Sequence, residues 1–598
     1  MPVTARTGKH VVVTAETAST TSSAADAASA ARERTAGTAD PVGRLVVGPL
    51  LRHADETSVS VWVEVTHGGT VTVSAADHTA SANTFCVHGH HYALVDVEGL
   101  APGSHLPYEV HLDDTRVWPP ARSQFPPSAL RTMDYSQPLR ITFGTCRNSV
   151  PHDRRTNRRF GIDVLRALAL RLADGGVPEP IGDPKQAASG WPSMLLFLGD
   201  QVYADETSDS MCEYIAHHRD ITEPPGEELA DFGEYAHLYR LAWSEPTIRW
   251  VLSTVPSAMV FDDHDVRDDW NSSYAWKQMM RSTPWWQGRI LGGLASYWVY
   301  QHLGNLTPAE RARDNVWQQV LAAEGADVGP ILDEFAAEAD ADPEAYRWSF
   351  RRDIGTTRLV VIDSRAARVL TENDRAMIDA VELNWLDEQL TGGTDHLLLG
   401  TSIPFLLPFG LHNGEAWNEA VAGGAWGKRA AGWAEHMRQF FDLEHWAAFQ
   451  RSFRDVQRMV AEVAAGERGQ APATVTFLSG DVHHSYLFEA DLPTGPGRSR
   501  VLQAVCSPIR NPLPQVVRFA TATMSYGVAG VIGRLLAKAT RVTRPLWTWS
   551  LVEGPWFDNS LATVDINGRE ATIAWETAAE GSDDDHLLWC PVSRARLS

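Results

Sequence analysis

The sequence predicts an α/β (α+β) fold that follows a small all-β domain. Between residues 43 and 125, runs such as TSVSVWVEVT and HYALVDVEGL alternate apolar and polar residues, as strands with one buried face do. After residue 126 the apolar runs become nearly continuous, as in SMLLFLGD and HLLLGTSIPF, and amphipathic stretches lie between them. Continuous apolar strands indicate sheets that are covered on both faces.

The chain divides into three predicted parts. Residues 1–42 are rich in Ala, Thr and Ser, and we expect a disordered tail there. Residues 43–125 are expected to form a β-sandwich of the fibronectin type III or immunoglobulin kind, because the run VEGLAPGSHLPYEVHL resembles the late strands of fibronectin type III domains. The proline-rich segment WPPARSQFPPSA leads into the large domain, residues 126–598, with a helical, Trp-rich insert expected at about 207–346.

Composition argues against several classes of function. The net charge is −23, so the chain would repel a nucleic acid, whereas its excess of acids suits multivalent cations. The five cysteines show no paired spacing, and no disulfide framework or zinc-finger pattern is readable. No uncharged apolar run approaches the roughly 18 residues of a transmembrane segment. Residues 1–40 lack the features of a signal peptide, so we expect a cytoplasmic protein, and the sequence leaves export open.

Reactive side chains follow four predicted strands at the point where each strand ends. The runs LRITFGTC, SMLLFLGD, SAMVFDDHD and ATVTFLSGD end in a thiol or in carboxylates, with a phenol or imidazoles close behind. Ligands of open α/β sheets bind at the carboxyl ends of the strands, so we expect these groups to converge. The convergent side chains are Cys146, Asp200, Tyr203, Asp262, Asp263, His264, Asp265, Asp481, His483 and His484.

Each of these motifs is weak by itself. An aspartate after a strand is most often a turn residue or a helix cap, and a cysteine there is usually an inert core residue. Four such motifs at one edge are better explained by bound cations, because massed carboxylates raise one another's pKa unless a counter-charge is present. Two ions held there could clamp a phosphoryl group and lower the pKa of bound water. The sequence therefore predicts a metal centre.

The ordered set of motifs resembles the calcineurin-like metallophosphatase superfamily, and within it the PhoD-like (alkaline phosphatase D) branch. That branch has a cysteine on its first strand in place of Asp-x-His, as in TCR at residues 145–147. Its Gly-Asp-x-x-Tyr is matched by GDQVY, its Asp-Asp-His-Glu by DDHD, its DTR-x-x-R by DSRAAR and its SGD-x-H by SGDVH. The matches run in order from about residue 139 to 510.

The resemblance implies a four-layer αββα sandwich and a metal-dependent phosphoester hydrolase of the alkaline phosphatase or phosphodiesterase type. In such an enzyme a metal-bound hydroxide at a dinuclear site attacks phosphorus in line. The branch implies one iron(III) ion with calcium at the second position, and another divalent metal is the alternative. The implied metal ligands are Cys146, Asp200, Tyr203, Asp263, Asp481 and His483.

The resemblance also implies roles for a histidine and two arginines. His264 corresponds to the histidine that hydrogen-bonds the phosphate or protonates the leaving alkoxide. Arg147 and Arg365 are expected to grip the phosphate, because a guanidinium group matches its oxygens in pairs. Two alternatives stay open: Tyr203 as a packed core ring, and His264 as a residue that only orients a neighbour. The stretch 268–271 also leaves open which side chain completes the ligands of the second metal.

The expected substrate is a small phosphomonoester or phosphodiester, and the Trp-rich composition adds a lipid headgroup as a candidate. A cationic amphipathic stretch, YGVAGVIGRLLAKATRVTRPLW, is either a core helix or an interfacial lid. The alternative function, from another class, is a non-catalytic binding protein on the same fold. A serine hydrolase ranks last because no Gly-x-Ser-x-Gly motif is present. The oligomeric state is not predicted.

Overall fold

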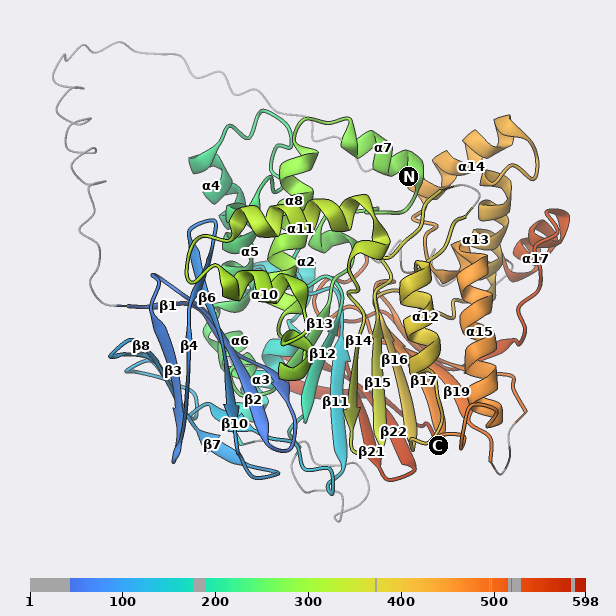
Figure 1. Cartoon of the computed structure of the whole chain (residues 1–598). Coiled ribbons are helices and arrows are strands. Elements are labelled where there is room, and N and C mark those ends of the chain that lie inside the picture. The colour runs from blue at the N-terminus through green and yellow to red at the C-terminus, as the bar shows by residue number, and fades with distance from the viewer. Residues whose placement is uncertain are drawn as a thin grey trace, which may run out of the picture. The chain divides into compact units, whose positions relative to one another are not determined.

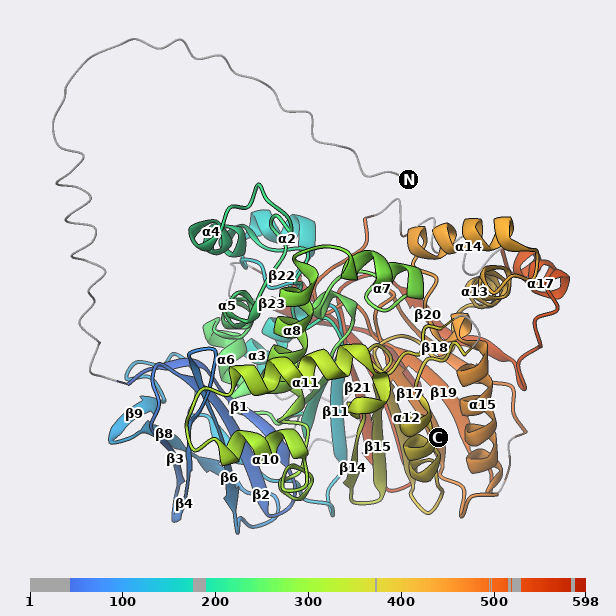
Figure 2. The same ribbon diagram turned by 45° about the horizontal axis from the view of Figure 1, so that its top comes forward.

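The computed structural model of the protein describes residues 43–175, 190–371, 374–493, 495, 497–514, 518, 529–581 and 587–598. The predicted disordered tail, residues 1–42, lies outside these residues. From Arg44 onward the described residues belong to one compact unit, which Figures 1 and 2 show from two sides. Among them, no helix has both the length and the apolar character needed to cross a membrane.

The N-terminal part is all β, with two four-stranded sheets. The first has the order β1 (Leu45–Ala54), β2 (Ser58–Val65), β6 (His90–Glu98), β5 (Phe85–Val87). The second has the order β4 (His78–Asn83), β3 (Thr70–Ala75), β8 (Glu109–Leu112), β9 (Thr115–Trp118). A pair of short strands, β7 (His105–Pro107) and β10 (Ala129–Arg131), connects this part to the large domain.

Strand β2 is buried on both faces although its sequence alternates. Its valines belong to the core cluster shared with the neighbouring strands, as the alternation predicts. Trp62 on the opposite face packs against Tyr300 of the large domain, with ring centroids 5.2 Å apart. The Tyr300 hydroxyl donates to Glu64 at 2.8 Å, and the buried Arg52 of β1 donates to the Gln301 carbonyl at 2.5 Å. The β-rich part is therefore joined to the large domain through a buried surface.

Two larger sheets form the centre of the large domain. The six-stranded sheet has the order β13 (Ser257–Val260), β12 (Met194–Leu198), β11 (Leu139–Gly144), β21 (Leu561–Asn567), β22 (Glu570–Glu580), β23 (Leu587–Arg596). The seven-stranded sheet has the order β14 (Phe350–Ile354), β15 (Thr357–Ile362), β16 (His396–Thr401), β17 (Thr474–Ser479), β19 (Arg500–Val505), β18 (Ser485–Ala490), β20 (Trp549–Trp556). Strands β11, β12 and β13 are parallel to one another, and so are β15, β16, β17 and β19.

The two large sheets share one buried core. Phe143 of the six-stranded sheet and Leu398 of the seven-stranded sheet belong to the same apolar cluster. Helices α12 (Ala380–Gln389) and α15 (Gln450–Ala465) run along the other side of the seven-stranded sheet (Figures 1 and 2). The continuous apolar strands are thus buried on both faces, as their sequences predict.

The predicted insert at 207–346 is largely helical, but strand β13 divides it. The run SAMV forms this short buried strand and pairs in parallel with β12, so residues 257–260 belong to the sheet. Buried tryptophans, among them Trp250 and Trp298, share an apolar cluster with Phe197 of β12. The longer helices are α4 (Asp209–His218), α5 (Phe232–Trp243), α6 (Pro246–Leu252), α7 (Tyr274–Arg281), α8 (Trp286–Tyr297), α10 (Asn315–Ala322) and α11 (Gly329–Ala341).

Three helices from the second half of the chain lie together. Helix α13 (Phe409–Ala422) packs against both α14 (Lys428–Phe440) and α17 (Ala529–Ala539). Both views place this group beside the end of the seven-stranded sheet (Figures 1 and 2). Helix α17 comes from the cationic amphipathic stretch that the sequence singles out.

Candidate metal centre

The loops that follow β11, β12 and β17 are hydrogen-bonded to one another. The Cys146 amide donates to the Gly199 carbonyl at 3.4 Å, and the Asp481 amide donates to Thr145 Oγ1 at 3.1 Å. Because these parallel strands end at the same edge, the residues that follow them meet there, although they are distant in the sequence. The strand-end argument therefore predicts correctly that these residues meet at one edge of the sheet, and their role as metal ligands stays a prediction.

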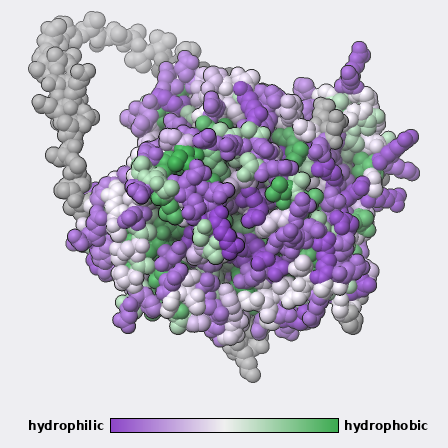
Figure 3. Space-filling view, viewed as in Figure 1, coloured by the Kyte–Doolittle hydropathy of each residue, from purple (hydrophilic) through white to green (hydrophobic). Residues whose placement is uncertain are grey.

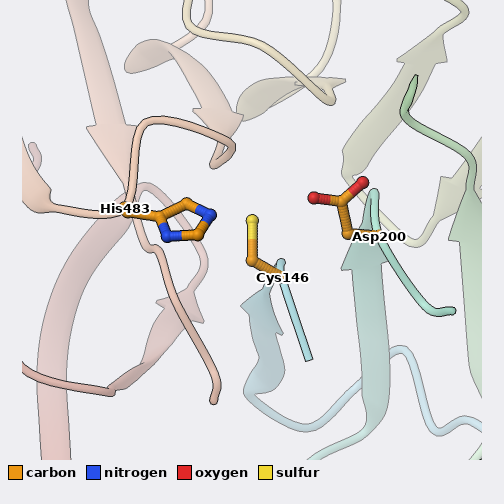
Figure 4. A group of neighbouring side chains, drawn as sticks. All are labelled: Cys146, Asp200 and His483. Atoms are coloured by element: carbon orange, nitrogen blue, oxygen red, sulfur yellow. The ribbon is translucent and has the colours of Figure 1, made fainter. Parts of the chain in front are cut away.

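The first group of candidate ligands consists of Cys146, Asp200 and His483. One ligand atom from each lies within 4.8 Å of the others, and Figure 4 shows the thiol between the imidazole and the carboxylate. The Tyr203 hydroxyl donates to Asp200 Oδ2 at 3.4 Å and accepts from Asn511 Nδ2 at 3.1 Å. The phenol hydroxyl thus contacts the carboxylate of this group. A tyrosine that only filled space in the core would not need this contact.

Two further groups adjoin the first. One consists of Asp200, Asp263 and His264, and the other of Asp262, Asp263 and Asp481, each with ligand atoms within 4.8 Å of one another. Asp200 belongs to the first two groups, and Asp263 belongs to the last two. The structure therefore brings five of the six predicted metal ligands into one chain of overlapping groups, and it places the sixth, Tyr203, in contact with Asp200.

The backbone at this edge is unusual. Cys146, Asp200, Asp481 and His483 have φ angles of 57°, 46°, 63° and 49°, in the left-handed region that residues other than glycine rarely adopt. Such a conformation costs on the order of 1 kcal/mol per residue and persists only where the surrounding fold imposes it, which happens often at functional sites. The fold therefore holds these four side chains in set directions at a cost in stability.

Two glycines make the crowded loops possible. At Gly199, where φ is 123°, an added Cβ would lie 2.7 Å from the Asp262 Cβ. At Gly480 an added Cβ would lie 2.0 Å from Thr145 Oγ1. Each glycine directly precedes an aspartate of the centre, so the Gly-Asp pairs seen in the sequence have a steric cause.

The carboxylates of the centre are buried close to one another, which disfavours their charged forms. Burial raises the pKa of the Asp200 carboxyl well above its usual range, and Asp262 and Asp263 raise it further against the opposing effect of His264. Burial, with help from Asp200 and Asp481, likewise raises the pKa of the Cys146 thiol. A nearby cation would remove both penalties.

Oxygen atoms without partners point to the same conclusion. Among the described residues, Asp200 Oδ1 and Asp262 Oδ2 are buried atoms with no hydrogen-bond partner. A buried carboxylate oxygen normally has a partner, and a metal ion is one that satisfies it. Thiol, phenol, imidazole and carboxylate are all metal-binding groups, so the donor set of this centre fits metal ions.

His264 is held by a carboxylate that the sequence analysis did not assign. Its Nδ1 lies 2.9 Å from Asp205 Oδ1, and its ring packs on Tyr203 with centroids 4.8 Å apart. Burial lowers the pKa of His264, but Asp205, together with Asp263 and Asp200, outweighs it and raises the pKa well above 6.5. With Nδ1 facing Asp205, Nε2 is the ring nitrogen that remains for a ligand.

The two predicted phosphate-binding arginines are buried against carboxylates. Arg365 forms an ion pair with Asp262, lies 3.1 Å from Asp263 Oδ1 and lies 2.5 Å from Glu444 Oε1. Arg147 donates to Asp163 from Nη2 at 2.8 Å and from Nε at 3.0 Å. Their contact with phosphate stays a prediction, and the observed contacts show that both arginines hold neighbouring acids in place.

Several residues of the centre carry no readable signal in the sequence. His445 lies with Nε2 3.1 Å from Asp481 Oδ2 and with Nδ1 2.7 Å from Glu415 Oε1. Neither His445 nor Glu444 follows a strand, and only the tertiary fold brings them to the centre. Asp205 could have been found, since it stands two residues after Tyr203 in the same loop.

Together, a mixed α/β fold with a buried cluster of metal-binding groups at its strand ends defines a metallohydrolase type of protein. Residues 185–524, more than half of the chain, match the family model described as PhoD-like phosphatase. The chain belongs to the PhoD-like phosphatase family and is a phosphoric ester hydrolase. Residues 42–130 match a model described as a domain of unknown function (DUF7800), and Cys146 and Arg147 lie between the two matches.

One solved structure agrees with this assignment at the level of the fold. A structure described as "Structure of PhoD" is 12% identical and superposes with a TM-score of 0.55, covering 93% of this chain and 91% of that one. A purple acid phosphatase, PPD1 from yellow lupin (Lupinus luteus) seeds, is 9% identical with a TM-score of 0.43, covering 89% and 72%, which is too remote to support an argument. No curated protein sequence matches the chain.

Proposed function

We propose that this phosphoester hydrolase uses a dinuclear metal centre in which Asp200 lies between the two ions. Iron(III) would be held by Cys146, Asp200, Tyr203 and His483, since thiolate and phenolate are strong anionic donors. Calcium, or another divalent metal, would be held by Asp200, Asp263 and Asp481. The observation that supports this arrangement best is that Asp200 belongs both to the thiol–imidazole group and to an adjoining carboxylate group.

Such ions, when bound, would polarise a phosphoryl group and activate water for attack on phosphorus. His264 would present Nε2 to the substrate, either to hydrogen-bond the phosphate or to give a proton to the leaving alkoxide. Asp205 would fix the direction of the ring by accepting from Nδ1. Arg365, buried among Asp262, Asp263 and Glu444, would keep the carboxylates oriented, and Arg147 would hold the first loop through Asp163.

The substrate class we propose is a small phosphomonoester or phosphodiester, with a lipid headgroup as the special case. We also infer that the two sheets and their helices are the four-layer αββα sandwich, because the sheets share one core. The part at 43–125 is proposed to be a fibronectin III-like sandwich, the rest of the chain from 126 to be the catalytic domain, and the cytoplasm to be its location.

The test combines metal content with activity. The purified full chain is expected to contain iron, to absorb visible light and to hydrolyse aryl phosphate mono- or diesters more rapidly with calcium added. Cys146→Ala should bleach the colour and lower turnover by orders of magnitude, whereas Cys212→Ala, a cysteine of α4, should change neither. A protein that binds no metal and hydrolyses no ester would favour a binding protein on this fold, and full activity in Cys146→Ala would remove the thiol from the ligand set.

A further inference from the structure

Exposed apolar side chains are concentrated on the helices α14 and α17 and on the segments beside them. Among the described residues, seven of the fifteen large hydrophobic side chains that are well exposed are found here, each at least 46% exposed. Such a concentration is unusual on a protein that stays in water and marks an interaction surface. The seven side chains, which we call the exposed apolar surface, are Trp426, Trp433, Phe440, Phe441, Ile532, Leu535 and Leu546.

The two helices present this surface together because both pack on α13. Trp417 of α13 contacts Trp426 and Trp433, with ring centroids 5.7 Å and 6.0 Å apart. Met437 of α14 and Leu536 of α17 pack against the same small core as Trp417. In the space-filling view, apolar side chains reach the surface at the right-hand side, where Figure 1 places α13 and α17 (Figure 3).

Basic residues accompany the exposed apolar side chains in the sequence, although the whole chain carries a net charge of −23. Residues 529–546 contain four basic residues and no acid, and residues 423–433 contain two basic residues and no acid. The nearby acids are few: Glu435 is paired with Arg438 at 2.7 Å, and Asp442 follows Phe441. The exposed basic residues are Lys428, Arg429, Arg534, Lys538, Arg541 and Arg544.

A cavity beside the same helices is also rich in cations. It has a volume of about 470 Å³ and is lined by residues of α7, α13, α14 and α15, by Leu370 and Arg375, and by the chain after α17. Its charged lining consists of four arginines and two glutamates, namely Arg375, Arg438, Arg454, Arg541, Glu419 and Glu435. The excess of positive charge suits an anionic group more than a neutral one.

We propose that the exposed apolar surface rests on a membrane that contains anionic lipids, with its apolar side chains among the headgroups and its cations against the lipid phosphates. Trp and Phe with Lys and Arg beside them are the side chains by which helices lie in the plane of a bilayer surface. Charge complementarity decides between occupants, because a second copy that met this surface with its own identical surface would set cations against cations, whereas an anionic membrane offers lipid phosphates. A protein bound in this way needs no spanning helix.

The surface and the metal centre share structural elements. Glu415 of α13 holds His445, and His445 contacts Asp481 of the centre. That lipid headgroups would then serve as substrates of the centre is a consequence that rests on the proposed function, whereas binding itself does not.

The experiment measures sedimentation of the full chain with vesicles of phosphatidylcholine, with and without phosphatidylglycerol. We expect binding only to the anionic vesicles, and weaker binding as salt is raised. Lys538→Glu and Arg541→Glu should each lower the partition coefficient by about fivefold or more, and Trp433→Ser with Phe440→Ser should abolish it. Matched controls are Leu321→Ser, an exposed leucine of α10 (54% exposed), and Arg313→Glu, which should bind like the parent protein.

Two further measurements test membrane binding and the proposed hydrolase function independently of each other. Asp200→Asn should bind vesicles as the parent does even if it hydrolyses nothing, and Trp433→Ser should still hydrolyse a soluble aryl phosphate, which shows that it is folded. Failure of the parent chain to bind anionic vesicles, or equal losses in the Leu321→Ser control, would overturn the proposal. So would a parent chain that is a dimer in solution and becomes monomeric in Trp433→Ser, because a second copy would then occupy the surface.

Discussion

The metal centre and the aromatic cluster of Tyr297, His302, Phe335, Tyr346 and Trp348 are both largely buried, yet they are stabilised in opposite ways. In the aromatic cluster, rings meet edge to face, as Trp348 does with His302 at 5.1 Å and with Tyr346 at 4.7 Å. In the metal centre, carboxylates meet carboxylates, and two buried oxygens have no partner in the described part of the chain. Both regions contain buried polar atoms without hydrogen-bond partners among the described residues. Those of the aromatic cluster are neutral groups, Tyr297 Oη and the two ring nitrogens of His302, whereas those of the centre belong to neighbouring acids that a bound cation would satisfy.

The two regions also make contributions to stability that change with pH in opposite directions. Burial raises the pKa of Asp265 in the centre to about 7, so the folded state holds this proton longer than the unfolded state does, and stability falls as pH rises from about 4 to 7. Burial, assisted by Arg347 and Arg52, lowers the pKa of His302 to about 3, so its contribution is lost as pH falls from 6.5 toward 3. Lowering the pH therefore increases the contribution of Asp265 to the free energy of unfolding and decreases the contribution of His302.

The largest effect is expected from Asp200→Asn, which removes the charge shared by two ligand groups. Activity should fall by more than the roughly 100-fold that loss of an outer contact to a metal ligand costs. In metal-free protein the same change should raise the melting temperature, because a buried charge that neighbouring acids disfavour is gone. Kinetics and thermal unfolding with a chelator measure both, and Asp209→Asn on α4 is the control. A variant that is active, or less stable without metal, would contradict the comparison.

A smaller effect is expected from His445→Ala, which removes the group that orients Asp481. Turnover should fall about 10- to 100-fold, as it does when residues behind a metal ligand are lost. Because His445 is not expected to touch the substrate, KM should change little, and the metal content should become easier to deplete with a chelator. His436→Ala, an exposed histidine of α14, should behave like the parent. Unchanged metal retention would mean that His445 does not act through Asp481.

The smallest effect is expected in the aromatic cluster. In His302→Phe, two buried ring nitrogens without hydrogen-bond partners among the described residues are removed, which should raise the free energy of unfolding by about 1 kcal/mol at neutral pH. Below pH 6.5 the advantage over the parent should grow by up to about 1.4 kcal/mol per pH unit. Denaturant unfolding at several pH values measures this, with His217→Phe on α4 as the control. A difference that stays constant across pH would show that the pKa of His302 is the same in the folded and unfolded states, which would contradict this prediction.

The sequence predicted most of the residues that meet in the candidate metal centre because they stand directly after strands. Parallel strands end at one edge, so Cys146, Asp200 and Asp481 had to meet once their runs were read as strands. His445 and Glu444 could not be found in this way, because they follow a helix and reach the centre only through the packing of α13 and α14. The apolar residues of 257–260 predict a strand, yet the predicted helical insert at 207–346 spans it. The local sequence pattern identifies the strand, but only its pairing with β12 in the structure shows that it belongs to the sheet.

The double burial of β2 has a consequence for how the chain can be divided. On one face of the strand, Trp62 packs on the ring of Tyr300 and Glu64 accepts a hydrogen bond from its hydroxyl. Arg52 donates to the backbone carbonyl of Gln301. A chain shortened to start at residue 126 would leave an aromatic ring and several hydrogen-bonding groups facing water, and the separated N-terminal piece would carry the complementary apolar face. The N-terminal part is thus packed firmly against the rest of the enzyme, and we expect it to be inherited and to unfold together with the part that contains the candidate metal centre.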